Sequence, residues 1–120
     1  MLFRSAISYA IYGKYEASKK HHFLDDTSFK HYLEWAKYFN QSTANKVGFI
    51  DQKIDHLWHG EIKNRNYFIR NKKINELGFN PYNDIKINKN GVWEWANASE
   101  ELKAYLNRYF KERKEDASLL

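Results

Sequence analysis

The chain contains no cysteine, one proline and five glycines among its 120 residues. Without cysteine there is no disulfide, no thiolate metal site and no cysteine nucleophile. This composition fits a cytoplasmic protein, which is the location we expect. So little glycine and proline excludes collagen-like and proline-rich proteins. No apolar run approaches the roughly 20 residues of a membrane-spanning helix, so the sequence predicts no membrane span.

Basic and aromatic residues are plentiful instead. Lys and Arg number 20 against 15 Asp and Glu, which leaves a net charge of +5, and 18% of the residues are aromatic. A basic balance is compatible with binding to nucleic acid or another anionic partner. The basic residues are interspersed with acidic ones, so an ordinary solvated surface is the favoured interpretation. A hydrophobic content of 42% at this length suffices for one core.

Hydrophobic periodicity predicts an α+β chain that is mostly helical. Apolar residues at helical spacing indicate three helices, over residues 3–16, 27–44 and 62–77. Gly78 is a natural stop for the third helix. A fourth helix is expected to start at Asn97, with Glu100 in capping-box spacing. Asp25 and Asp26 precede the second helix and are interpreted as capping residues rather than an acid–base pair.

Two short hairpins are predicted between these helices. Residues 46–58 change to a shorter period, and residues 84–95 flank a turn cluster at 88–91. Trp93 and Trp95 alternate around Glu94, so both indoles should lie on one face of a strand. For two tryptophans at this spacing, burial in the core is the favoured interpretation, and stacking on sugar rings is the alternative.

The densest polar and aromatic cluster is His-Leu-Trp-His-Gly-Glu at residues 56–61, followed by several arginines and asparagines. His56 and His59 can share a metal ion or an anion only if the backbone turns between them, and Gly60 permits such a bend. A helix start near Ile62, next to His and Arg, would favour a phosphate group. Histidines that bond only to the backbone are an equally weighted alternative.

Other polar residues receive structural interpretations. His21 and His22 border an expected loop and are interpreted as surface residues, and His31 receives no role. The basic residues from 63 to 73 are interpreted as a solvated helix face, with pairing to a diphosphate or to acidic groups as the alternative. Neither a glycine-rich phosphate loop nor a Gly-x-Ser-x-Gly elbow occurs in the sequence.

These blocks resemble the C-terminal segment of bacterial and phage family 2-like glycosyltransferases, whose catalytic domain has the GT-A fold. The resemblance covers roughly residues 5–116. Its most specific part is the His-Leu-Trp-His-Gly block with the Arg and Tyr residues that follow. It rests on residues 56–60, 65–67, 70, 79–81, 84–85 and 90–95, and on the closing residues 109–116.

The resemblance implies ligands and roles for individual residues. In GT-A enzymes a late histidine joins Asp-x-Asp carboxylates in holding Mn²⁺ or Mg²⁺ on the diphosphate of a nucleotide sugar. That role falls to His56 or His59, which the sequence does not separate. Trp58 would lie beside the sugar, and the other implied substrate-binding residues are Arg65, Tyr67 and Arg70, with Arg65 or Arg70 near the phosphates. A nucleotide sugar and a glycan acceptor are the implied partners.

The chain also departs from the family pattern. It has no nucleotide-binding half, no Asp-x-Asp motif and no Gly-Gly-Gly-Asp-like segment for the catalytic carboxylate. We therefore expect one partial domain over residues 1–116 and a frayed tail at 117–120. Such a chain would be inactive alone, would bind metal weakly and would have no catalytic residue of its own, and its missing half could be a separate chain. Phe3, Ile7 and Ile11 are expected to be exposed. The alternative function is a small basic binding module for nucleic acid or another anionic partner.

Overall fold

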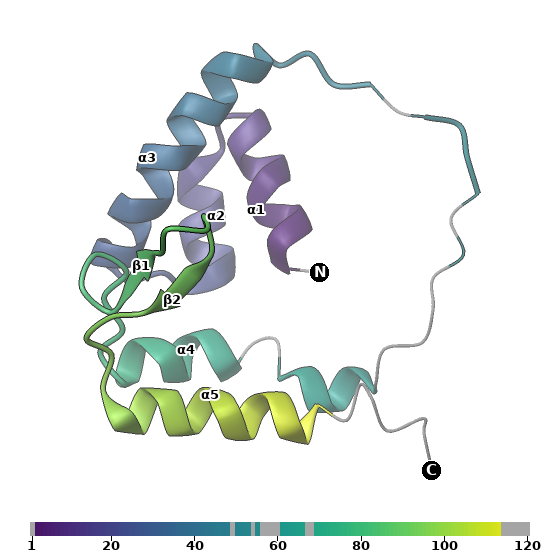
Figure 1. Ribbon diagram of the computed structural model, residues 1–120. Helices are drawn as coiled ribbons and strands as arrows, with labels where there is room; N and C mark the ends of the chain where they lie inside the picture. Colours follow the sequence, from purple (N-terminus) through teal and green to yellow (C-terminus); the bar gives the residue numbers. More distant parts are fainter. Residues whose placement is uncertain (1, 49, 54, 56–60, 67–68, 114–120) are drawn as a thin grey trace.

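The computed structural model describes residues 2–48, 50–53, 55, 61–66 and 69–113. Over these residues the chain is α+β and mostly helical, with five α-helices and a two-stranded antiparallel sheet, which confirms the predicted fold class. Figure 1 shows α1, α2 and α3 as one group, with α4 and α5 side by side beneath it. The elements in chain order are α1 (Leu2–Ile11), α2 (Tyr15–His22), α3 (Asp26–Thr43), the 3₁₀ helix η1 (Ile62–Arg65), α4 (Ile69–Glu76), β1 (Ile85–Ile87), β2 (Trp93–Trp95) and α5 (Glu100–Glu112).

The single helix predicted over residues 3–16 is instead two helices. Gly13 has a φ of +65°, and the chain turns there between α1 and α2. A left-handed backbone costs glycine little because it has no Cβ. The apolar spacing of residues 3–16 therefore spans a turn that periodicity alone does not reveal.

Close contact between α1 and α3 organises the first group of helices. Ala10 and Ala36 have no exposed surface, and small side chains of this kind let two helix backbones approach. Tyr32 donates a hydrogen bond of 2.9 Å to the Ala6 carbonyl oxygen. At the other end of α1, the Asn40 amide donates to the Ile11 carbonyl oxygen at 2.6 Å. The second bond satisfies a carbonyl that a helix end leaves without an intrahelical partner.

The helix predicted over residues 27–44 is confirmed as α3. Asp25 is its N-cap, and its carboxylate accepts a hydrogen bond of 2.7 Å from the Ser28 backbone N–H. This is the capping role predicted for the Asp25–Asp26 pair, fulfilled by Asp25. Asp26, the first residue of the helix, forms an ion pair of 2.6 Å with Lys19 of α2.

The helix predicted over residues 62–77 is also interrupted. Asn66 adopts a left-handed conformation with a φ of 45° and ends η1. Its carbonyl oxygen then accepts hydrogen bonds from the Ile69 and Arg70 N–H groups at 3.1 and 2.9 Å. Gly78, at a φ of +72°, follows the end of α4 as predicted.

Of the two predicted hairpins, the one at 84–95 is confirmed. Strands β1 and β2 pair in the register Ile85↔Trp95 and Ile87↔Trp93. Asn88 closes the turn, since its side-chain oxygen accepts from the Asn90 and Val92 N–H groups at 2.9 and 3.1 Å. This is the turn that the Asn- and Gly-rich cluster predicts.

The hairpin predicted at 46–58 is wrong for the residues that the structure describes there. Residues 46–48, 50–53 and 55 contain no strand, and all of them are exposed. An alternating pattern stabilises a strand when one face is buried against a core. None of the described side chains in this segment is buried, so no core contact stabilises a strand there.

The start of α5 differs from the prediction by two residues. Ser99, not Asn97, is the N-cap, and its hydroxyl accepts a hydrogen bond of 3.2 Å from the Leu102 N–H. The Asn97 amide instead donates to the Asn83 carbonyl oxygen at 3.2 Å. Asn97 thus joins the two ends of the hairpin segment, which places the helix start two residues later.

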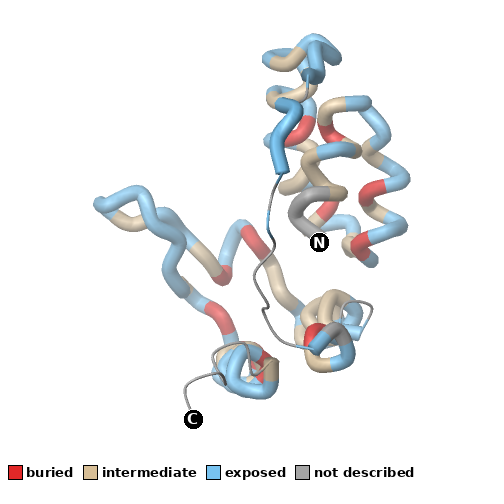
Figure 2. The backbone as a smooth tube through the Cα atoms, turned by 90° about the vertical axis from the view of Figure 1, so that its right-hand side faces the viewer, coloured by how far each residue is buried: buried red, intermediate tan, exposed pale blue. Residues whose placement is uncertain are grey.

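The buried residues are spread over both parts of the chain. Figure 2 shows buried positions in the α1–α3 group and along the α4–hairpin–α5 part. Ile7 and Ile11, expected to be exposed, are half-buried, and the side chain of Phe3 lies outside the described residues. No described helix is long and apolar enough to cross a membrane. The buried hydrophobic residues are Ala10, Phe29, Ala36, Ala98, Leu102 and Tyr109.

Candidate functional site

Two of the six predicted site residues can be placed. Arg65 is the last residue of η1 and Arg70 the second residue of α4. The structure brings both to one position, next to α5. His56, Trp58, His59 and Tyr67 lie outside the described residues, so the bend at Gly60 and the shared histidine site stay predictions.

Tyr109 is the centre of this position. Its ring is 5% exposed, and its hydroxyl donates a hydrogen bond of 2.9 Å to the Arg65 carbonyl oxygen. The same hydroxyl accepts a bond of 2.7 Å from the Arg70 guanidinium. Tyr109 thereby joins η1, α4 and α5 through one oxygen atom.

Two guanidinium groups lie over the Tyr109 ring. The central carbon of Arg70 is 5.8 Å from the ring centroid, and that of Arg113 is 5.6 Å from it. Contacts within about 6 Å are attractive because the ring face is electron-rich. The Arg65 backbone adjoins the same tyrosine through its carbonyl oxygen, and the residue is 8% exposed. We call Arg65, Arg70 and Arg113 the arginine cluster.

Local sequence spacing explains how the arginine cluster forms. Tyr109 and Arg113 are four residues apart at the C-terminal end of α5, so they lie on one side of that helix. Arg65 and Arg70 are brought together by the turn at Asn66, which redirects the chain from η1 into α4. Guanidinium groups bind phosphate oxygens well, and two of them lie against the Tyr109 ring.

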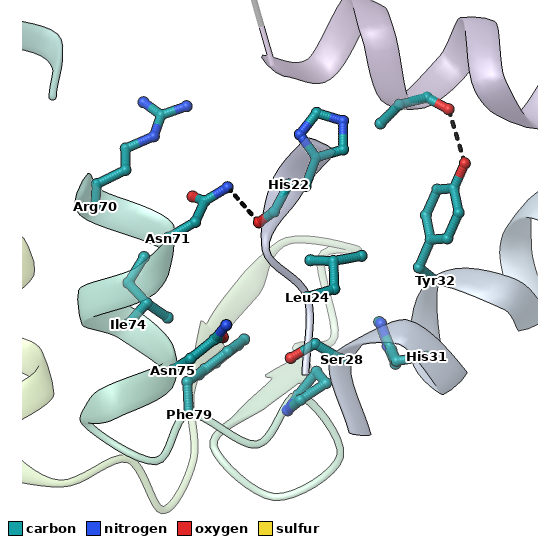
Figure 3. Close-up of a pocket in the computed structure, with 12 residues that line it drawn as sticks. His22, Leu24, Ser28, His31, Tyr32, Arg70, Asn71, Ile74, Asn75 and Phe79 are labelled. Atoms are coloured by element: carbon teal, nitrogen blue, oxygen red, sulfur yellow. Dashed lines mark hydrogen bonds between the residues drawn. The ribbon is translucent and has the colours of Figure 1, made fainter. Parts of the chain in front are cut away.

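A cavity of about 360 Å³ lies beside the cluster, between the first helical group and α4. Figure 3 shows α4 side chains on one wall and residues of α2, α3 and their connection on the other. Arg70 belongs to both the arginine cluster and the cavity lining. The other lining residues are Ala6, His22, Leu24, Ser28, His31, Tyr32, Asn71, Ile74, Asn75, Phe79 and Pro81.

His22 is buried in the cavity wall, so its interpretation as a surface residue is wrong. It is 5% exposed, and its Nε2 lies 3.4 Å from the Ser5 hydroxyl oxygen. Burial, helped by the nearby His21 and Arg70, lowers the pKa of His22 from 6.5 to about 4. The imidazole is therefore neutral at pH 7. Local sequence does not reveal this burial, because the end of α2 is hydrogen-bonded to α4, 49 residues away.

Trp93 and Trp95 occupy the opposite environment from the one predicted. They are 55% and 41% exposed, so the core interpretation is wrong. The sheet has two strands, and Trp93 lies near α3, where the ring centroids of His31 and Trp93 are 6.4 Å apart. His31, to which the sequence assigned no role, also lines the cavity.

Metal binding has no support from the described part of the chain. No group of three or more His, Asp and Glu residues among them could hold an ion. His56 and His59 are outside these residues, and their assignment to Mn²⁺ or Mg²⁺ rests on the resemblance.

Sequence reasoning missed Tyr109, Arg113 and two amides of α4. The amide of Asn71 donates a hydrogen bond of 3.0 Å to the His22 carbonyl oxygen. The amide of Asn75 donates a hydrogen bond to the Phe23 carbonyl oxygen. The four-residue spacing of the two asparagines, around Ile74, was the available signal for a shared face.

No protein-family model, no curated protein and no solved structure matches this chain. The resemblance to family 2-like glycosyltransferases therefore rests on the sequence blocks given above.

Proposed function

We propose that this chain is the metal- and acceptor-side C-terminal segment of a nucleotide-sugar-dependent glycosyltransferase of GT-A fold. In this proposal the arginine cluster binds the diphosphate of the donor. The observation that supports it is the position of Arg70 and Arg113 over one buried tyrosine ring, to which the Arg65 backbone is hydrogen-bonded. The resemblance assigns Arg65 or Arg70 to the phosphates.

The electrostatics of the cluster favour a multiply charged anion. A diphosphate can accept paired hydrogen bonds from planar guanidinium groups, which makes arginine better suited to it than lysine. Tyr109 holds the Arg70 guanidinium by a hydrogen bond before any ligand arrives. A guanidinium that is already fixed in this way loses less conformational entropy when the ligand binds.

His56 or His59 would hold the divalent ion, and Trp58 would lie beside the sugar. When bound, a divalent metal neutralises charge on the diphosphate leaving group. The carboxylates that complete such a site in the family are absent from this sequence. The chain alone is therefore expected to bind metal and nucleotide weakly and to transfer no sugar.

Titration with uridine diphosphate tests the role of the arginine cluster. The chain should bind this nucleotide weakly, and Arg70→Gln and Arg113→Gln should each lower the affinity about tenfold, since about 1.4 kcal/mol corresponds to that factor. Arg108→Gln, an exposed position on α5, is the matched control and should leave the affinity unchanged. Calorimetry with and without Mn²⁺ gives the readout.

Equal affinities for all three variants would contradict the assignment of the cluster. Submicromolar binding by the 120-residue chain alone would contradict its role as a partial domain.

The exposed indoles favour a second candidate function, a small basic binding module for nucleic acid. Trp93 and Trp95 are accessible, and aromatic faces stack on bases in single strands. Steeply salt-dependent retention on oligonucleotides, lost in Trp93→Ala, would favour this candidate over the glycosyltransferase segment.

A further inference from the structure

The cavity beside α4 is held open by hydrogen bonds across it. Asn71 and Asn75 donate to the carbonyl oxygens of His22 and Phe23, at the C-terminal end of α2. Such carbonyls have no partner within their own helix, so the two amides satisfy them while fixing α4 at a distance. On the α3 side, the Tyr82 hydroxyl donates to Glu34 at 2.7 Å. The walls are therefore set before a ligand binds.

The lining of the cavity has two chemically different ends. Figure 3 shows Arg70 and His22 near one end and Phe79 near the other. Arg70 is the one Lys or Arg among the described lining residues, and no Asp or Glu is among them. The apolar part of the lining is formed by Ala6, Leu24, Tyr32, Ile74, Phe79 and Pro81.

Size and lining together define a ligand class. A volume of about 360 Å³ lies within the range of small-molecule sites, which are mostly apolar with a few polar groups that fix orientation. An apolar body is favoured by the aromatic and aliphatic wall. One cation at one end, with no carboxylate among the described lining residues, favours one anionic group on that body.

We propose that this cavity binds a small amphipathic anion. Its apolar ring fills the space lined by Tyr32 and the other apolar residues, and its carboxylate or phosphate group pairs with Arg70. The site is separate from the diphosphate position of the proposed function, because its walls come from α1, α2, α3 and α4 rather than from η1 and α5. Arg70 is the residue that the two sites share.

Methyl NMR titrations with three naphthalene probes test the proposal. 1-Naphthyl phosphate and 1-naphthoate should shift the Leu24 methyl signals and bind at least about tenfold more tightly than 1-naphthol. The tighter of the two anions identifies the head group. Arg70→Gln should reduce the affinity for the anions to that for 1-naphthol.

Filling the cavity should remove binding of every probe. Ile74→Trp from the α4 wall and Ala6→Leu from the α1 wall should each lower the affinity for 1-naphthyl phosphate at least about tenfold. Two independent walls keep the test valid if one variant fails to fold, and Leu77→Trp, outside this cavity on the same chain segment, is the control. Unchanged affinity in a folded filling variant, or equal affinity for 1-naphthol and the anions, would overturn the proposal.

The two sites are distinguished by their variants. Ile74→Trp should leave uridine diphosphate binding unchanged, while Arg113→Gln should leave 1-naphthyl phosphate binding unchanged. Loss of both ligands in both variants would contradict the existence of a separate cavity site.

Discussion

Tyr109→Ala is expected to lower the free energy of unfolding by about 3 to 5 kcal/mol, the usual cost of removing a buried aromatic side chain. Tyr109 is 5% exposed, and its hydroxyl joins the Arg65 carbonyl oxygen to the Arg70 guanidinium. The substitution leaves a cavity between η1, α4 and α5 and removes the ring beneath two guanidinium groups. Urea unfolding followed by circular dichroism measures the loss.

Two further variants separate the ring from the hydroxyl. Tyr109→Phe keeps the ring and should cost about 1 to 3 kcal/mol, because it leaves the Arg65 carbonyl oxygen without this donor. Phe110→Ala, at a neighbouring position that is 60% exposed, should change the stability by no more than about 0.5 kcal/mol. Similar losses in Tyr109→Ala and Phe110→Ala would mean that Tyr109 does not hold these elements together.

The chain should lose stability as the pH falls from 6.5 to 4 because of His22. Burial lowers the pKa of the folded-state imidazole to about 4, whereas the unfolded chain keeps the ordinary value of 6.5. Between these values the unfolded state binds a proton that the folded state does not, so protonation favours unfolding. The loss should approach about 3 kcal/mol near pH 4, since each pKa unit corresponds to about 1.4 kcal/mol. The contribution becomes constant about one pH unit above 6.5, where the unfolded imidazole is also neutral.

Urea unfolding at pH 7 and pH 4.5 isolates the contribution of His22. His22→Gln should reduce the difference in stability between the two pH values by about 2 kcal/mol. His21→Gln, an exposed neighbour on the same helix, should keep most of that difference. The same pH dependence in both variants would show that His22 is not the group responsible.

Local signals in the sequence predicted the parts of the fold that depend on local chemistry. Asp25 caps α3, Gly78 follows α4, and the turn at 88–91 joins two short strands. Each of these depends on residues within a few positions of one another. The predictions that were wrong depend on distant packing. Asn97 bonds to Asn83 instead of capping α5, and residues 46–48 have no buried face to make a strand.

The candidate site was predictable only in part for the same reason. The resemblance selected Arg65 and Arg70, which the structure places together, but it did not select Tyr109 or Arg113. These two residues enter the site because α5 packs beside α4 (Figure 1), and no spacing between residues 70 and 109 encodes that contact. The burial of His22 is likewise not predictable locally, because α4 packs against it through Asn71, 49 residues away.

Sugar transfer in the presence of a GT-A nucleotide-binding half is the most direct test of the proposed function. The chain is fused to such a half, one that carries the Asp-x-Asp motif and the catalytic carboxylate, and transfer from radiolabelled nucleotide sugars is measured with Mn²⁺. We expect no transfer by the chain alone, transfer by the fusion, and its loss in His56→Ala or His59→Ala with the circular dichroism spectrum unchanged. Transfer by the isolated chain, or full transfer by a fusion with both histidines replaced, would contradict the account.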